Sequence, residues 1–292
     1  MNRIKGILYA AVSSSTFGLA PFFSITLLLD GFSAFAVLSY RWGVASIVLI
    51  VFGWLSGCNF RLAGKDWGVV FLLSLLRAVT SFSLIIAYQN IASGVASTIH
   101  FMYPLAVALA MMFFFREKKS LLVILAVLMS LLGAALLSLG ELEAKSGNTM
   151  VGLVAACVSV FSYAGYIVGV RTTRAVQINS TALTCYVMGL GTIFYLIGAY
   201  CTSGLQLVSD GYTWLIILGL ALPATAISNI TLVQAIKYAG PTLTSILGAM
   251  EPLTAVVIGV FVFKELFTVN SAVGIILILL AVSIVVFRRQ KS

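Results

Sequence analysis

Three charged residues lie inside long apolar stretches of the sequence, where a charge needs a partner or a water-filled cavity. They are Arg41, Arg77 and Glu251. A charged group in hydrocarbon costs at least about 2.5 kcal/mol on insertion scales. If each stretch is a helix, the rise of 1.5 Å per residue puts each charge roughly 14 Å from the nearer helix end, close to a membrane midplane. Two cations and one acid make a net positive centre, which suits a ligand with a carboxylate or another anionic group.

These charges and the single histidine also have plainer interpretations. Glu251 could neutralise one arginine in a fixed structural pair, and for Arg41 this alternative is as open as a place in the cavity. His100 is the only histidine. Because histidine titrates near pH 6.5, His100 is a candidate coupling residue for a proton-driven cycle, and a buried Glu251 is another. The alternative for His100 is a hydrogen-bonded packing residue.

Two prolines fall in the middle of apolar stretches. Pro104 and Pro252 have no amide hydrogen, so they should free the carbonyl groups of His100 and Gly248, four residues earlier. We expect both helices to bend there and to act as gates, because interrupted helices are typical of transport sites. The alternative is a static kink that serves packing only.

Polar and aromatic side chains recur at three- and four-residue spacing in the same stretches. Such faces describe an amphipathic cavity for a small molecule with a charged head and an apolar body. Phe17, Ser159 and Thr225 belong to these faces. Serines and tyrosines also bond neighbouring helices, so individual members could be structural. The predicted substrate-binding residues are Arg77, Ser81, Tyr88, Tyr103, Tyr163, Asn229 and Glu251.

Composition predicts the elements that position these residues. The 292 residues are 61% hydrophobic and 9% charged, whereas a soluble protein carries about 25% charge. Apolar runs long enough to cross about 30 Å of hydrocarbon fill the chain, and a barrel would instead show alternating segments of about ten residues. We therefore expect an all-α membrane protein with ten transmembrane helices, at approximately 4–29, 32–55, 66–89, 93–115, 120–139, 149–170, 180–202, 213–237, 241–263 and 269–287.

The basic residues behind the net charge of +9 gather in loops on one side of the predicted membrane, so they indicate the orientation of the chain and not a nucleic-acid partner. With a cytoplasmic N-terminus, only Lys145 and Lys264 among the loop bases fall outside. We expect both termini in the cytoplasm and the protein in a bacterial cytoplasmic (inner) membrane. The bases expected inside are Arg3, Lys5, Arg61, Lys65, Arg116, Lys118, Lys119, Arg171, Arg174, Lys237, Arg288, Arg289 and Lys291.

The chain also repeats itself at an offset of 148 residues. Tyr103-Pro104-Leu105 leads to Arg116-Glu117, and Glu251-Pro252-Leu253 leads to Lys264-Glu265. Residues 1–143 and 144–292 would each hold five helices. Because five is odd, the second half would enter the membrane from the opposite side, which makes an inverted repeat.

The duplicated motif resembles the drug/metabolite transporter superfamily, in particular its ten-helix EamA-type members. The resemblance implies a secondary transporter, commonly an exporter of amino acids, other metabolites or drugs, with a central cavity between two repeats. Arg41 in the second helix also looks like the family pattern. The chain departs from internal symmetry where Tyr103 stands opposite Glu251 and Arg77 opposite Thr225. The best matching segments are Gly94-Val95-Ala96-Ser97 with Tyr103-Pro104 and Arg116-Glu117, and Ser245 with Glu251-Pro252 and Lys264-Glu265.

We therefore expect a secondary active, proton-coupled or facilitative transporter that exports a small amphipathic metabolite, such as an amino acid, by alternating access. The alternatives are an uptake carrier for an organic anion or nucleoside-like metabolite, a channel or receptor, and a membrane-embedded transferase. One histidine and one intramembrane acid disfavour the transferase. The expected partners are a small-molecule substrate, the lipid bilayer and, in a coupled cycle, protons. No cofactor, metal or nucleic acid is expected, and a monomer and a homodimer both remain open.

Overall fold

The protein is all-helical in the part of the chain that the structure describes. The computed structural model describes residues 2–91, 93–117, 120–138, 147–202, 204–261 and 269–288, and these ranges contain helices, turns and loops but no strand. Seven candidate membrane spans lie among the described residues by length and composition, and two shorter apolar helices, Leu121–Gly133 and Ala272–Ile284, accompany them. The prediction of an all-α protein with apolar spans is confirmed.

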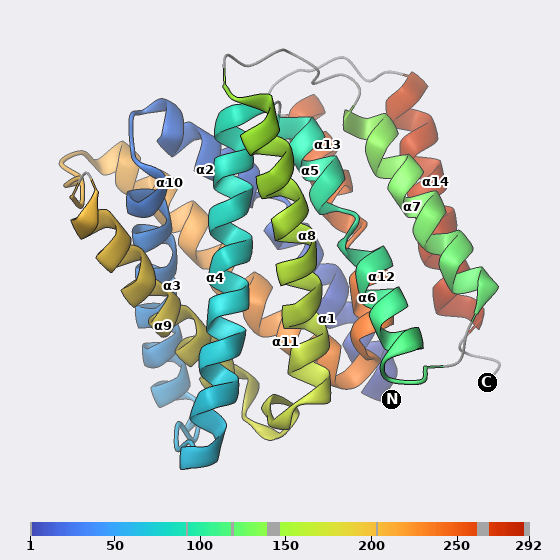
Figure 1. Ribbon diagram of the computed structural model, residues 1–292, viewed down its shortest axis with the longest axis horizontal. Helices are drawn as coiled ribbons and strands as arrows, with labels where there is room; N and C mark the ends of the chain where they lie inside the picture. The colour runs from blue at the N-terminus through green and yellow to red at the C-terminus, as the bar shows by residue number, and fades with distance from the viewer. Residues whose placement is uncertain are drawn as a thin grey trace.

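The helices follow the predicted apolar runs, and several runs are interrupted (Figure 1). The first half contains α1 (Asn2–Phe17), α2 (Ala20–Leu29), α3 (Ala34–Leu55), the short 3-10 helix η1 (Gly64–Asp66), α4 (Trp67–Asn90), α5 (Ser93–His100), α6 (Tyr103–Phe113) and α7 (Leu121–Ser138). The second half contains α8 (Thr149–Thr172), the 3-10 helix η3 (Arg174–Gln177), α9 (Ser180–Cys201), α10 (Gly211–Ala221), the π-helical segment η4 (Leu222–Ile227), α11 (Ser228–Ala239), α12 (Pro241–Leu247), α13 (Met250–Phe261) and α14 (Val269–Arg288).

Short polar side chains begin several of the long helices. The amide of Ala36 donates to Ser33 Oγ at 3.2 Å, and that of Thr213 donates to Asp210 Oδ1 at 2.8 Å. Asn148 and Asn179 accept from the first-turn amides of α8 and α9 in the same way. Such caps satisfy amides that have no partner inside the helix. The polar residues between the apolar runs therefore fix where these helices begin.

The main helix contacts join the two halves of the chain. α4 packs on α8 and α9, α1 on α11, α3 on α9, and α7 on α14. In Figure 1, α7 and α14 form a pair at one side of the molecule. The aromatic part of the core lies on α6 and α8, where Tyr103, Tyr163 and Tyr166 belong to one buried cluster. The centre of the molecule is therefore built from residues of both halves.

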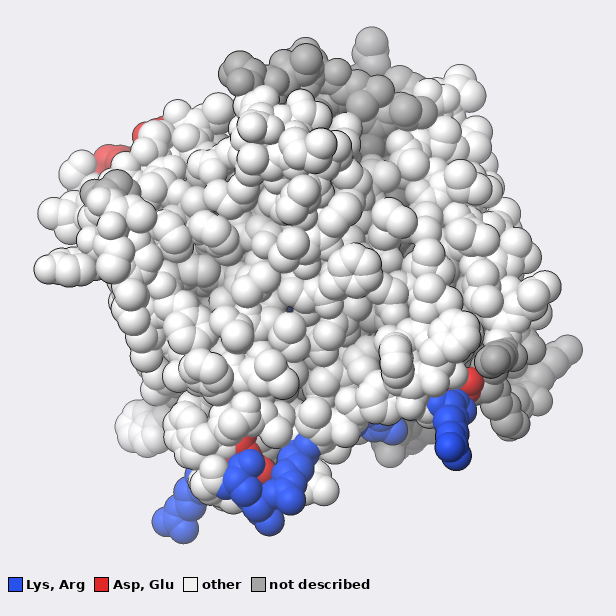
Figure 2. Space-filling model, in the orientation of Figure 1, with Lys and Arg blue, Asp and Glu red and all other residues white. Residues whose placement is uncertain are grey.

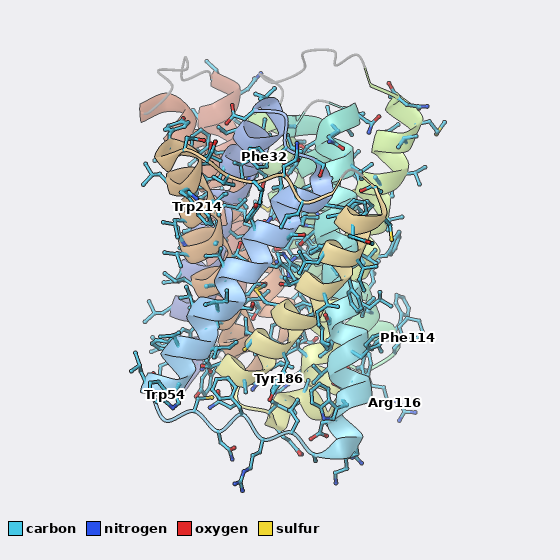
Figure 3. The ribbon with its side chains drawn as sticks, turned by 90° about the vertical axis from the view of Figure 1, so that its left-hand side faces the viewer. Phe32, Trp54, Phe114, Arg116, Tyr186 and Trp214 are labelled. Carbon is cyan, nitrogen blue, oxygen red and sulfur yellow. The ribbon has the colours of Figure 1, made fainter. Side chains whose placement is uncertain are left out.

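Charged and aromatic side chains mark the two ends of the helical bundle. Lysine and arginine side chains gather along the lower edge of the view in Figure 2. Arg116 and Tyr186 lie toward that lower end, and Phe32 and Trp214 lie toward the opposite end (Figure 3). Aromatic residues at both ends of an apolar zone are typical of the two membrane interfaces. The predicted charged positions Lys118, Lys119, Lys145, Lys264, Glu265, Arg289 and Lys291 lie outside the described residues.

Three of the apolar runs break into two helices near their middle: between α1 and α2, between α5 and α6, and between α12 and α13. α5 ends at His100 and α6 begins at Tyr103, with Pro104 in its first turn. α12 ends at Leu247 and α13 begins at Met250, with Pro252 in its first turn. The interruptions expected at Pro104 and Pro252 are therefore present. The carbonyl of Gly248 was expected to be free, and this is wrong: the amide of Glu251 donates to it at 2.9 Å, because the chain turns tightly there.

Candidate functional site

The three helix breaks meet in the centre of the molecule. The third break separates α1 from α2 and lies at Gly18, ahead of Pro21. A Cβ atom built on Gly18 would lie 2.6 Å from the carbonyl oxygen of Glu251. A Cβ built on Gly248 would lie 1.8 Å from the hydroxyl of Tyr103. Glycine at position 18 therefore lets the break between α1 and α2 contact the break between α12 and α13. Glycine at position 248 lets the break between α12 and α13 contact the break between α5 and α6.

The carboxylate of Glu251 is held by a tyrosine. Tyr103 Oη donates to Glu251 Oε1 at 3.3 Å. Tyr103 is 2% exposed, whereas Glu251 keeps partial exposure. The rings of Tyr103 and Tyr163 lie edge to face with centroids 4.6 Å apart, which fixes the hydroxyl toward α13. All three residues belong to the predicted site, and the structure brings them together.

The two buried arginines are positioned by one segment of the second half. Arg41 Nε donates to Thr225 Oγ1 at 2.7 Å, and Arg77 Nε donates to Asn229 Oδ1 at 3.0 Å. Asn229 Nδ2 in turn donates to the carbonyl of Thr225 at 2.8 Å. Thr225 lies in the π-helical segment η4, and its own hydroxyl donates to the carbonyl of Leu220. The π-helical segment η4 and the first turn of α11 therefore supply the side chains that hold the two guanidinium groups.

Aromatic rings cover the guanidinium groups. Arg77 Cζ lies 5.3 Å from the ring centroid of Phe17 and 4.8 Å from that of Tyr163. Arg41 Cζ lies 5.6 Å from the same Phe17 ring. Rings at this distance attract a cation electrostatically, and the attraction grows when water is excluded. The Phe17 ring thus contributes to holding two like charges in one buried region.

A small cavity adjoins both arginines. Its volume is about 10 Å³, and its lining residues other than Pro21 are buried. Arg41 Nη2 and Arg77 Nη1 are buried and have no acceptor among the described residues. This cavity is too small for a metabolite. Its lining comprises Phe17, Ala20, Pro21, Ser24, Arg41, Arg77, Thr80, Ser81, Leu84, Ile85 and Tyr88.

His100 lies between aromatic rings, next to Tyr103 and Tyr163. Its Nδ1 lies 2.8 Å from Ser159 Oγ, which itself donates to the carbonyl of Ala156 at 2.6 Å. The serine has one hydroxyl hydrogen, so when it donates to Ala156, Nδ1 is the donor to Ser159. The imidazole also stacks on Tyr163, with ring centroids 5.3 Å apart. Its Nε2 has no hydrogen-bond partner among the described residues.

The predicted site residues fall into two adjoining groups. Arg41, Arg77, Ser81 and Tyr88 line the cavity, and Asn229 holds one of its arginines. The second group surrounds the Tyr103 hydroxyl and comprises Tyr103, Tyr163, His100 and Glu251 with the neighbouring prolines Pro104 and Pro252.

The hydrogen bonds of the three central charges go to neutral partners. Among the described residues, Glu251 is bonded by Tyr103, Arg41 by Thr225 and Arg77 by Asn229. Among these residues, neutral side chains and not a direct ion pair hold Glu251 and the two arginines in place. The sequence prediction missed Ser24, which is 1% exposed and lines the cavity. A polar side chain inside the predicted apolar run 4–29 was the available signal.

Comparisons with known proteins agree with this architecture. A family model described as the EamA-like transporter family matches residues 4–139 and again residues 150–287. An uncharacterized transporter of Archaeoglobus fulgidus is 28% identical over 238 residues, which is 80% of this chain and 83% of the relative. A crystal structure described only as that of a protein is similar in fold, with a TM-score of 0.79 at 17% identity over 97% of this chain and 96% of the other. Because the family model covers nearly the whole chain, the protein belongs to the EamA-like transporter family, whose members are membrane transporters.

Proposed function

We propose that the protein exports a small amphipathic metabolite with an anionic group, such as an amino acid, by alternating access. The observation that carries this proposal is the pair of buried arginines, each with an N–H group that no described residue accepts, at the cavity beside the helix breaks. An anionic head would satisfy those N–H groups, and the surrounding aromatic rings would take the apolar body.

In the proposed architecture, ten transmembrane helices form two inverted repeats, residues 1–143 and 144–292. The two separate matches of the family model support a division near this point. The contact between Tyr103 and Glu251, at equivalent positions of the repeats, supports a pseudo-twofold axis through the centre. The gathering of basic side chains at one end supports cytoplasmic termini in a bacterial inner membrane.

The proposed substrate contacts divide between the two groups of residues. Arg77 binds the anionic head, with Ser81, Tyr88 and Asn229 around it and Tyr163 covering it. Tyr103 and Glu251 face an amine of the substrate or, in a coupled cycle, exchange a proton. Arg41 supports the positive centre through Thr225. His100 is a second coupling candidate.

The proposed gates are the broken helices that carry Pro104 and Pro252. Entry of a metabolite requires the cavity of about 10 Å³ to expand, so elements around it must move. Half-helices can tilt at a break without losing an internal hydrogen-bond ladder, because the ladder is already interrupted there. Movement of α6 or α13 would separate Tyr103 from Glu251, so their hydrogen bond is a natural closing contact.

A counterflow assay in liposomes tests this function. Candidate substrates come from a thermal-shift screen of amino acids, amines, organic acids and nucleosides against the purified protein. Vesicles preloaded with an unlabelled hit should accumulate the labelled compound, since a carrier exchanges and a channel does not. We expect Arg77→Gln to lower the rate at least about tenfold, because a charge-assisted hydrogen bond is lost.

Arg174→Gln is the matched control, because it makes the same change of charge at an exposed position in η3. It should transport normally. Saturable exchange that survives both Arg77→Gln and Glu251→Gln unchanged would show that the site is assigned wrongly. Flux of a screened compound without saturation or counterflow would overturn the carrier itself. Preloading vesicles of known orientation then establishes the direction of transport.

A further inference from the structure

The positive charge around the cavity exceeds the negative charge that the protein supplies there. Arg41 and Arg77 are 5% and 1% exposed and share the Phe17 ring. Glu251 is the only acid near them among the described residues, and its carboxylate is bonded by Tyr103. The other described acids lie at helix ends, at Asp30, Asp66, Glu117 and Asp210. Two arginines and one acid leave a net positive charge in a largely buried region.

The two guanidinium groups also have donors that no described residue accepts. Each Nε is engaged, but Arg41 Nη2 and Arg77 Nη1 are buried without an acceptor among the described residues. A buried charged N–H group without an acceptor is strongly unfavourable. Both arginines line the same cavity. The most economical acceptor is therefore one group that reaches both side chains.

The size of the cavity selects the kind of acceptor. About 10 Å³ is close to the smallest cavity volume that holds one water molecule. A monatomic ion needs a similar space, whereas a carboxylate with its carbon skeleton does not fit. Ser24 and Ser81 add hydroxyl groups to the lining, and hydroxyls can donate to an anion. A water molecule would fit as well, but it would not compensate the charge.

We propose that the cavity between Arg41 and Arg77 is a binding site for a small inorganic anion, namely a halide such as chloride. The halide neutralises the closed site when no substrate is bound, and the anionic group of a substrate replaces it when the site opens. Halide binding goes beyond the proposed transport function, and it can be measured on the purified protein without any flux.

Binding is measured on the full-length protein in an uncharged detergent. Sodium chloride or bromide replaces sodium gluconate at constant ionic strength, because the gluconate skeleton is too large for the cavity. The thermal unfolding midpoint should rise with halide concentration and saturate. The ³⁵Cl NMR line width, which reports exchange of chloride with a bound site, should give the same apparent dissociation constant.

Variants locate the site. Arg41→Gln and Arg77→Gln should each weaken halide binding at least about tenfold, whereas the control Arg174→Gln should stay within about twofold of the wild type. Ser24→Val keeps both charges and fills part of the cavity. It should weaken binding too. Because both arginines are present in this variant, weaker binding cannot be explained by misfolding that follows the loss of an arginine.

The outcomes separate this proposal from the transport function. Equal halide binding by the wild type and by Arg41→Gln, Arg77→Gln and Ser24→Val would overturn the site. The proposal also fails if formate stabilises the protein through the two arginines and chloride does not, because the cavity is then a carboxylate subsite. Counterflow that continues in gluconate medium after such a result would leave the proposed function standing.

Discussion

The hydroxyl of Tyr103 donates to the carboxylate of Glu251 at 3.3 Å, and the two residues are 148 positions apart. This separation equals the offset of the sequence repeat, so each residue contacts its own counterpart in the other half. Both stand next to a proline at a helix break. This contact therefore joins the two halves of the chain through equivalent but chemically different residues.

Removal of the Tyr103 hydroxyl should loosen this closing contact. Tyr103→Phe keeps the ring packing on Tyr163 and deletes only the hydrogen bond to Glu251. We expect a loss of about 1 kcal/mol in the free energy of unfolding and a changed counterflow rate. Tyr200→Phe is the control, because Tyr200 is 89% exposed. Wild-type stability and an unchanged rate would show that the bond does not close the site.

Gly248 should tolerate no side chain while Tyr103 is present. The Cβ of Gly248→Ala would lie 1.8 Å from the Tyr103 hydroxyl and 2.7 Å from the carbonyl oxygen of Ser245. We expect a loss of about 1–3 kcal/mol, measured by thermal unfolding. Gly189→Ala has open space and should be neutral or slightly stabilising. Tyr103→Phe combined with Gly248→Ala should recover part of the loss, and a fully additive double variant would contradict the clash.

Thr225 should matter more than its small side chain suggests. Thr225→Val has nearly the same shape but leaves Arg41 Nε without its acceptor. We expect the unfolding free energy to fall by about 1–3 kcal/mol. Counterflow should fall as well, because Arg41 is no longer held at the cavity. Thr231→Val on α11 is the control, since that hydroxyl bonds only to carbonyls of its own helical turn. Equal effects at both positions would contradict a special role for Thr225.

The pH dependence of transport should distinguish the two coupling candidates. Glu251→Gln removes the titratable carboxyl at the closing contact and should flatten the pH profile of counterflow. His100→Gln should keep the profile and lose about 1 kcal/mol of stability, because His100 is bonded to Ser159 and packed on Tyr163. Measurement of both variants from pH 5 to 8 covers the range in which histidine titrates. A flat profile in His100→Gln alone would assign coupling to the histidine.

Asp210 should make the start of α10 sensitive to acid. The Thr213 amide donates to its carboxylate, and this bond lowers the pKa of Asp210 below the usual aspartate value. Its stabilising effect is therefore complete above the unfolded pKa and is lost as the pH falls through the lowered native pKa. Asp210→Asn keeps an acceptor but cannot titrate, so its unfolding midpoint should fall less steeply with acidification below about pH 4. Parallel curves for both proteins would exclude this contribution.

Much of the fold follows from the chain's local pattern. Apolar runs of membrane length must satisfy their backbone groups internally, so helices are the outcome for the runs predicted here. Proline removes one hydrogen bond at a known place, which is why interruptions could be expected at Pro104 and Pro252. Helical spacing placed Arg77, Ser81 and Tyr88 on one face, and all three line one cavity.

Only the tertiary structure decided which groups meet. Arg41 bonds Thr225 across 184 positions, and this hydroxyl lies in the π-helical turn that contains Pro223. The close approach of the third break, at Gly18, to the backbone of Glu251 is likewise visible only in the tertiary structure. Local pattern determines a helix and its faces, because its hydrogen bonds are internal. The rotation and approach of helices depend on packing between residues distant in sequence, and that packing gave Glu251 a tyrosine partner and left the two arginines facing a shared cavity.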